Sequence, residues 1–391
     1  MIDSALTKSK GGRHLIVVSY VCIWTCFYLL VHHSSDKTQQ EASNVVTNSA
    51  ILVICVEMIK IFVSAGLYLK NHTLVDLNIF LSSGRVKSLL VCYMPVAILY
   101  AIYNNLMFMN LRSNHPSVYL VLSSSRLLMT AVVWQIQFKV QIANIRKVAL
   151  VLITLGLFAK EMIGQEPSID EENNDGDTIQ SYYGVLLILF QMSCSVMAGI
   201  CNENLLKNDD CDQYLQNICL YVNSIAINLL IGAGFMSSKE EVDFASEMEM
   251  LMSPISISII LTLATAGIMS SMVLRYENSI TKGVASASET ALTSLIEFCF
   301  YGYTFMMPEL FGIMLVSAGT VLYSFSGPVK IKKRLLHGKR RRAMHASRRL
   351  RKVTILSLCQ YVFLPAFMMT YALLHFRLAN NEHWNNFSEV R

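Results

Sequence analysis

Long apolar runs, separated by short polar connections, dominate the pattern of this sequence. A helix needs roughly 20 apolar residues to cross a bilayer, and several of these runs reach that length. The pattern therefore predicts an all-α polytopic membrane protein with ten spans. The expected helices are 14–32, 46–69, 87–110, 114–137, 145–163, 182–201, 213–235, 253–274, 283–303 and 309–326.

The composition excludes an ordinary soluble protein. Of all residues 53% are hydrophobic and only 15% are charged, whereas soluble domains carry about 25% charged residues. Residues 1–13 are polar and basic, and the run 14–32 is long enough to span and lacks a small-residue cleavage site. We therefore expect a first membrane helix here rather than a cleaved signal peptide.

The distribution of Lys and Arg predicts the orientation. With residues 1–13 in the cytosol, most basic loop residues fall on the cytosolic side, as the positive-inside rule requires. The acidic stretches 166–177 and 238–250 then fall on the far side, so that 164–181 forms an acidic luminal loop. The cytosolic basic residues are Lys8, Lys10, Arg13, Lys70, Arg85, Lys87, Lys139, Arg146, Lys147 and Lys207.

The C-terminal region adds a basic segment and one more apolar run. Residues 328–352 are rich in Lys and Arg without any acidic residue, which indicates a cytosolic segment that contacts anionic headgroups. The run 353–376 either crosses as an eleventh helix or lies in the membrane interface, since it contains Pro365 and His375. Glycosylation of Asn386, in an Asn-Phe-Ser sequon, would place the tail 377–391 in the lumen.

The two halves of the chain resemble each other weakly. Residues 109–120 and 272–283 each contain a Leu-Arg pair and a short polar turn before a Ser-rich helix. The halves, 14–163 and 182–327, contain five expected spans each, so they enter the membrane in opposite orientations. This arrangement is typical of inverted-repeat transporters, which hold the substrate between the halves near the midplane.

Polar residues recur at helical spacing inside four expected spans. A charge at the bilayer centre costs at least about 2.5–3.5 kcal/mol, so it faces a partner or a wet cavity. Hydrogen bonds between helices explain isolated Ser and Thr, but they do not explain cations, amides and carboxylates on the same faces. The stripes are Glu57, Lys60 and Ser64; Tyr119, Ser123, Arg126 and Thr130; Asn217, Tyr221, Ser224 and Asn228; and Lys282, Ser286, Glu289, Thr293 and Glu297.

This chemistry suits a phosphorylated ligand with a base and a sugar. Arg126 and Lys282 supply positive charge from opposite halves, and an arginine binds phosphate bidentately. Tyrosine rings can stack on a base, amides can read base or ribose edges, and carboxylates can accept sugar hydroxyls. Glu57 either contributes to this site or pairs structurally with Lys60. The expected site comprises Tyr100, Asn104, Asn105, Tyr119, Arg126, Asn217, Tyr221, Lys282, Ser286 and Glu289.

The sequence shows no catalytic constellation and no metal motif. The cysteines form no CxxC pair, and there is no GxSxG motif, Gly-rich phosphate loop or EF-hand pattern. We therefore expect neither an enzyme nor a cofactor or metal site. A basic tail beside ten spans does not indicate a nucleic-acid partner.

Five stretches carry a family resemblance: Tyr100–Asn105 (Tyr-Ala-x-x-Asn-Asn), Tyr119–Thr130, Gly199–Lys207, Asn217–Tyr221, and Arg275-Tyr276 with Lys282-Gly283. Together they resemble the nucleotide-sugar transporter family, in its CMP-sialic acid and UDP-galactose transporter branch, over about 14–326. The sequence departs from this pattern at Ser123, Ser124, Ser279 and Glu289, and it has Arg126 where the family usually has Lys.

The resemblance implies a ten-helix drug/metabolite-transporter fold in the Golgi membrane, or alternatively in the endoplasmic reticulum. It implies exchange of a cytosolic nucleotide sugar for a luminal nucleoside monophosphate, with Arg126 and Lys282 at the phosphates. We expect a UDP-sugar, UDP-galactose or a relative, with the lipid bilayer and a second copy of the chain as potential partners. The alternatives are a transporter of a different solute on this fold, or a non-transporting membrane scaffold.

Overall fold

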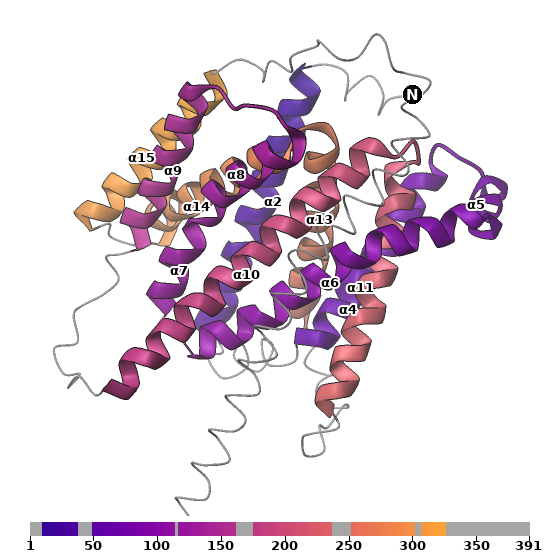
Figure 1. Ribbon diagram of the computed structural model, residues 1–391, viewed down its shortest axis with the longest axis horizontal. Helices are drawn as coiled ribbons and strands as arrows, with labels where there is room; N and C mark the ends of the chain where they lie inside the picture. The colour runs from indigo at the N-terminus through magenta and orange to yellow at the C-terminus, as the bar shows by residue number, and fades with distance from the viewer. Residues whose placement is uncertain are drawn as a thin grey trace, which may run out of the picture. The chain divides into compact units, whose positions relative to one another are not determined.

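A computed structural model describes residues 10–37, 49–113, 116–161, 175–236, 252–301 and 306–325 (Figure 1). These residues form helices and no strand, which confirms the expected all-α fold. The chain divides into two units, 1–329 and 330–391. The basic segment 328–352, the run 353–376 and Asn386 lie outside the described residues.

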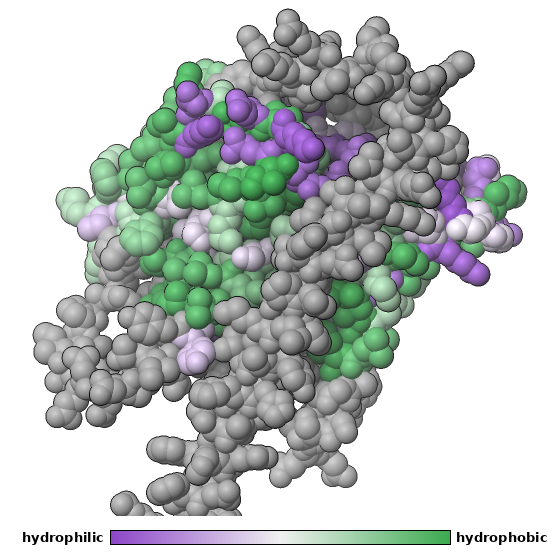
Figure 2. Space-filling view, in the orientation of Figure 1, coloured by the Kyte–Doolittle hydropathy of each residue, from purple (hydrophilic) through white to green (hydrophobic). Residues whose placement is uncertain are grey.

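Helices occupy all ten places where the apolar pattern predicts a span. They are α2 (Lys10–Lys37), α4 (Ser49–Leu69), α6 (Gly84–Ser113), α7 (Pro116–Ser124) with α8 (Arg126–Phe138), α9 (Asn144–Glu161), α10 (Asp175–Asn208), α11 (Gln213–Met236), α13 (Pro254–Tyr276), α14 (Ser279–Tyr301) and α15 (Met307–Phe325). Eight stretches within them are long and apolar enough to cross a membrane, and Figure 2 shows hydrophobic residues along the flanks of these helices. α9 and α14 are less apolar, because they carry several charged or hydroxyl side chains.

The span expected at 114–137 is not one continuous helix. It is interrupted at Ser125, between α7 and α8. The Ser125 hydroxyl donates to the Leu122 carbonyl at 2.6 Å, and the Ser123 and Ser124 hydroxyls both donate to the Leu120 carbonyl. Serine hydroxyls that bond to backbone carbonyls in this way compete with the helix ladder and bend it. The interruption makes Arg126 the first residue of α8.

An extra short helix, α5 (Leu74–Ser82), joins α4 to α6, where we expected only a connection. It begins with a capping box: the Thr73 hydroxyl accepts from the Asp76 amide at 3.2 Å, and the Asp76 carboxylate accepts from the Thr73 amide at 3.0 Å. These hydrogen bonds favour the ionised form and hold the pKa of the Asp76 carboxyl below its usual range. None of the α5 residues is buried, so the helix is a peripheral element.

Glycines let α9 and α15 pack backbone against backbone. A Cβ placed on Gly156 would lie 2.7 Å from the Gly312 carbonyl oxygen, and one on Gly312 would lie 2.6 Å from the Gly156 oxygen. In a membrane, where lipid is as apolar as the side chains, such close approach through small residues is a main source of helix association. α9 and α15 therefore form a tightly packed helix pair, which is visible at the upper left of Figure 1.

One end of the described helices collects basic residues from several connections, and we call it the basic end. There, Arg85 near the start of α6 pairs with Asp209 after α10 at 3.2 Å. The Arg146 guanidinium near the start of α9 lies 4.9 Å from the ring centroid of Tyr323 near the end of α15. These contacts place the end of α10 beside the start of α6, and the end of α15 beside the start of α9. The positive-inside rule predicts that this end faces the cytosol.

Candidate functional site

Arg126 lies among tyrosines rather than carboxylates. Its Nη1 donates to the Tyr103 hydroxyl of α6 at 3.3 Å. Tyr20 and Tyr28 of α2 also lie close enough to act on its charge. Glu289 lies near enough to interact electrostatically with Arg126 but beyond ion-pair distance, and Arg126 forms no ion pair with any carboxylate of the described residues. The guanidinium therefore keeps donors for an anion.

Lys282 brings a second cation to the same region from α14. It is half-buried, and Arg126 of α8 and Lys60 of α4 are the charges that act on it most strongly. Within the described part of the chain, no carboxylate pairs with Lys282. Like charges that share a low-dielectric interior repel one another, and an anion between them would relieve that repulsion. The structure thus brings together the two residues that the sequence predicted would bind phosphate.

A groove of about 570 Å³ runs beside Arg126, a volume within the usual range of ligand pockets. Leu127 and Thr130 of α8 and Gly283 of α14 are among its lining residues. It extends to Lys160 in the last turn of α9, and so toward the end opposite the basic end. Ser286 lines the groove as expected, whereas Lys282 and Glu289 do not. The hydroxyl residues along it are Tyr28, Ser123, Ser124, Thr130, Ser286, Thr290, Thr293 and Ser294.

A second polar region lies between α10 and α11, and it contains amides without partners. Asn217 is 0% exposed, and neither its side-chain nitrogen nor its oxygen has a hydrogen-bond partner among the described residues. The side-chain oxygen of Asn202, on α10, is likewise without a partner in this part of the chain. Tyr100 lies beside Asn202 and packs in the same apolar cluster as Tyr221. Because a buried unsatisfied polar group costs about 1–3 kcal/mol, these amides are suited to hydrogen-bond a ligand.

Lys60 lies beside this second region and forms an ion pair with Glu57. Structural pairing with Lys60 is one of the two roles that we considered for the Glu57 carboxylate. The Lys60 ammonium lies 2.9 Å from the Glu57 carboxylate and 5.2 Å from the centroid of the Tyr221 ring. Gly267 of α13 makes room for it, since a Cβ there would lie 2.9 Å from the Lys60 nitrogen. The sequence placed Lys60 on a polar stripe, but the contact with Tyr221 was missed because it joins α4 to α11.

Three predicted residues are engaged with the protein or turned from the groove. The buried Tyr119 hydroxyl accepts from Gln191 of α10 at 2.9 Å, and the Asn105 amide donates to its own helix at the Ala101 carbonyl. Glu289 is 2% exposed and does not line the groove, although it lies near enough to act on Tyr20 and Tyr28 of α2 and on Arg126. Asn104 is half-buried. These positions leave Arg126, Lys282, Asn217 and Tyr221 as the core of the candidate site.

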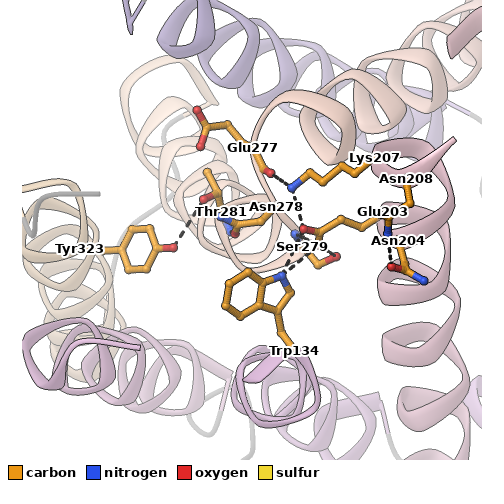
Figure 3. Close-up of polar contacts among 10 residues, drawn as sticks. All are labelled: Trp134, Glu203, Asn204, Lys207, Asn208, Glu277, Asn278, Ser279, Thr281 and Tyr323. Carbon is orange, nitrogen blue, oxygen red and sulfur yellow. Dashed lines mark hydrogen bonds and ion pairs between the residues drawn. The ribbon is translucent and has the colours of Figure 1, made fainter. Parts of the chain in front are cut away.

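Glu203 forms a hydrogen-bonded cluster at the basic end that the sequence analysis did not predict (Figure 3). It is 1% exposed and accepts from the Trp134 indole of α8 at 3.2 Å, from the Ser279 amide at 2.8 Å and from the Ser279 hydroxyl at 2.7 Å. Lys207 pairs with it at 2.7 Å and also donates to the Glu277 carbonyl. Glu203 and Lys207 lie within the stretch Gly199–Lys207 that carries the family resemblance, but this stretch does not reveal their partners on other helices.

The membrane-spanning helices and the polar side chains between them together define a class of protein. Multiple membrane-spanning helices enclose cations, amides and hydroxyls, with a groove large enough for a solute. A polar interior of this kind is typical of carriers that move hydrophilic solutes through a bilayer.

The chain belongs to the nucleotide-sugar transporter family, whose sequence profile matches residues 12–324. It is 29% identical over 350 residues to the UDP-galactose transporter senju of Drosophila melanogaster, covering 82% of this chain and 88% of that protein. It is 21% identical to CMP-sialic acid transporter 1 of Oryza sativa subsp. japonica, over 59% of this chain and 71% of the relative. A solved crystal structure at 11% identity shares the fold, with a TM-score of 0.55 over 80% of this chain and 96% of that one.

Family membership confirms several expectations from the sequence. The protein is a multi-pass membrane transporter of nucleotide sugars and not an enzyme. The resemblance that carried this prediction is therefore correct at the level of the family.

Proposed function

We propose that this chain moves a UDP-sugar, with UDP-galactose as the first candidate, from the cytosol into the Golgi lumen in exchange for a nucleoside monophosphate. The observation that carries the proposal is the pair of cations, Arg126 and Lys282, which act on each other and have no carboxylate partner among the described residues. The similarity to a UDP-galactose transporter over most of both chains supports the choice of sugar.

The polar regions on either side of these cations suit the rest of the ligand. Asn217 and Asn202 can donate to and accept from a base, and Tyr221 can stack on it. The hydroxyl-lined groove beside Arg126 can accept and donate hydrogen bonds to a sugar. In this arrangement the phosphates lie between base and sugar, as they do in the chemical structure of a nucleotide sugar.

The positive charges of Arg126 and Lys282 also give a reason for the exchange of a nucleotide sugar for a nucleoside monophosphate. A nucleotide sugar and a nucleoside monophosphate share the nucleotide, so both neutralise Arg126 and Lys282. Without either ligand, two cations would have to be carried through a low-dielectric barrier, which is costly. We therefore expect the empty carrier to change orientation slowly, so that transport requires a substrate on each side.

The uptake of labelled nucleotide sugars into proteoliposomes tests this function. Vesicles that contain the purified protein and are preloaded with UMP are expected to accumulate UDP-galactose at least about tenfold faster than vesicles without UMP, because loading relieves the slow return step. UDP-GlcNAc, UDP-GalNAc and CMP-sialic acid are offered in parallel.

The controls vary the compound that is loaded into the vesicles. Uridine inside the vesicles, which lacks the phosphate, should give no stimulation. Equal rates with and without internal UMP would contradict exchange, and a preference for CMP-sialic acid with internal CMP would contradict the choice of UDP-sugar.

A further inference from the structure

The Glu203 cluster joins the two helices that carry the cations. Through the Trp134 indole, Glu203 is bonded to α8, whose first residue is Arg126. Through the Ser279 amide and hydroxyl, it is bonded to the first residue of α14, one turn before Lys282. Figure 3 shows these side chains converging from separate helices on one carboxylate. The relative position of the two cations is therefore tied to one side chain that contacts neither of them.

The chemistry of this contact makes it strong and selective for a carboxylate. Both oxygens of Glu203 are occupied by four donors, of which one is a lysine ammonium. A carboxylate at a helix N-terminus is also favoured by the helix dipole, and here it bonds the first backbone amide of α14. A neutral side chain of the same shape could not accept all of these bonds.

The cluster also lies between the groove and the basic end. On α8, Trp134 comes one turn after Thr130, which lines the groove, and on α14, Ser279 comes one turn before Gly283. Thr281 extends the connection to α15, where its hydroxyl lies 3.4 Å from that of Tyr323. Contacts among α8, α10, α14 and α15 thus hold these helices together at the basic end.

We propose that Glu203 is a positioning residue that sets the spacing of Arg126 and Lys282 for phosphate while the basic end is closed. This inference rests on the proposed function, because it takes a nucleotide phosphate as the ligand of the two cations. When the basic end opens, the bonds of Glu203 to Trp134 and Ser279 have to break, and the cations move apart. Closure of the basic end and the binding of phosphate by Arg126 and Lys282 are then coupled.

The substitution Glu203→Gln tests this role, with UMP and uridine as probes of binding to the purified full-length protein. The removal of a negative charge by itself strengthens the binding of an anion, so weaker UMP binding reports displaced cations. We expect UMP affinity to fall about ten- to hundredfold, the scale of a small misplacement at a site. Uridine affinity should change less than about twofold, since the amides of α10 and α11 remain.

Two further variants make the test specific. Glu277→Gln removes a carboxylate from the same cluster, but its side chain does not bond Lys207, which binds the Glu277 backbone carbonyl. It should bind UMP like the wild type. Trp134→Phe removes the indole donor and part of the ring but keeps an aromatic side chain, and it should lower UMP affinity in the same direction, by less. It carries the test if Glu203→Gln does not fold.

The outcomes are distinguishable. If the wild type does not prefer UMP over uridine, the proposed function fails. If the wild type shows this preference and Glu203→Gln keeps it in full, the positioning role is wrong. Equal losses for UMP and uridine in a folded variant would also overturn the inference, because they would indicate a general structural role.

Discussion

Replacing Lys282 with alanine is expected to lower UDP-galactose uptake at least about 100-fold, which corresponds to about 2.7 kcal/mol. The reason is that Lys282 is one of two cations beside the phosphates, and truncating one partner of a desolvated charge pair costs about 2–5 kcal/mol. Uptake into proteoliposomes preloaded with UMP measures the effect. Lys282→Arg, which retains the charge, should keep part of the activity.

Lys147 offers a matched control for this loss of charge. It is an exposed lysine near the start of α9 at the basic end, and Lys147→Ala removes the same charge away from the interior. This variant should transport like the wild type. Full residual uptake by Lys282→Ala, with normal amounts of protein in the membrane, would remove Lys282 from the site.

The second large effect is expected at Arg126. Arg126→Ala should abolish uptake to a similar extent, whereas Arg126→Lys should retain transport with a KM raised about tenfold, since a lysine keeps the charge but loses the planar pair of donors. The Tyr103 hydroxyl accepts a hydrogen bond from the guanidinium, so Tyr103→Phe keeps the charge of Arg126 and removes a contact that orients it. Initial rates over a range of UDP-galactose concentrations distinguish these cases.

A different result at Arg126 would change the interpretation. If Arg126→Ala lowered uptake of every nucleotide sugar only slightly, transport would require neither the charge nor the shape of this side chain.

The sequence predicted the positions of the helices because a bilayer demands long apolar runs, and this signal is independent of tertiary packing. The interruption before Arg126 was not predicted. It depends on whether the hydroxyls of Ser123, Ser124 and Ser125 bond to backbone carbonyls or to neighbouring helices, and both options are open to a serine within a membrane span.

The candidate site was predictable only in part, for a similar reason. Cations inside spans are costly, so Arg126 and Lys282 stood out as candidate site residues from the sequence alone. The partners of Glu203 come from positions 134, 207 and 279, on three helices, and no local pattern links them. Helical spacing also placed five residues of α14 on one face, whereas only Ser286, Thr293 and Glu297 of them line the groove, and Lys282 and Glu289 do not.

The most direct test of this account compares the binding of UMP and uridine to the purified wild-type protein and to the double variant Arg126→Ala/Lys282→Ala. The two ligands differ only in the phosphate, so the ratio of their dissociation constants reports the contribution of the two cations. We predict that the wild type binds UMP at least about 100-fold more tightly than uridine, and that the double variant binds both within about threefold. A double variant that kept the wild-type ratio would contradict the account.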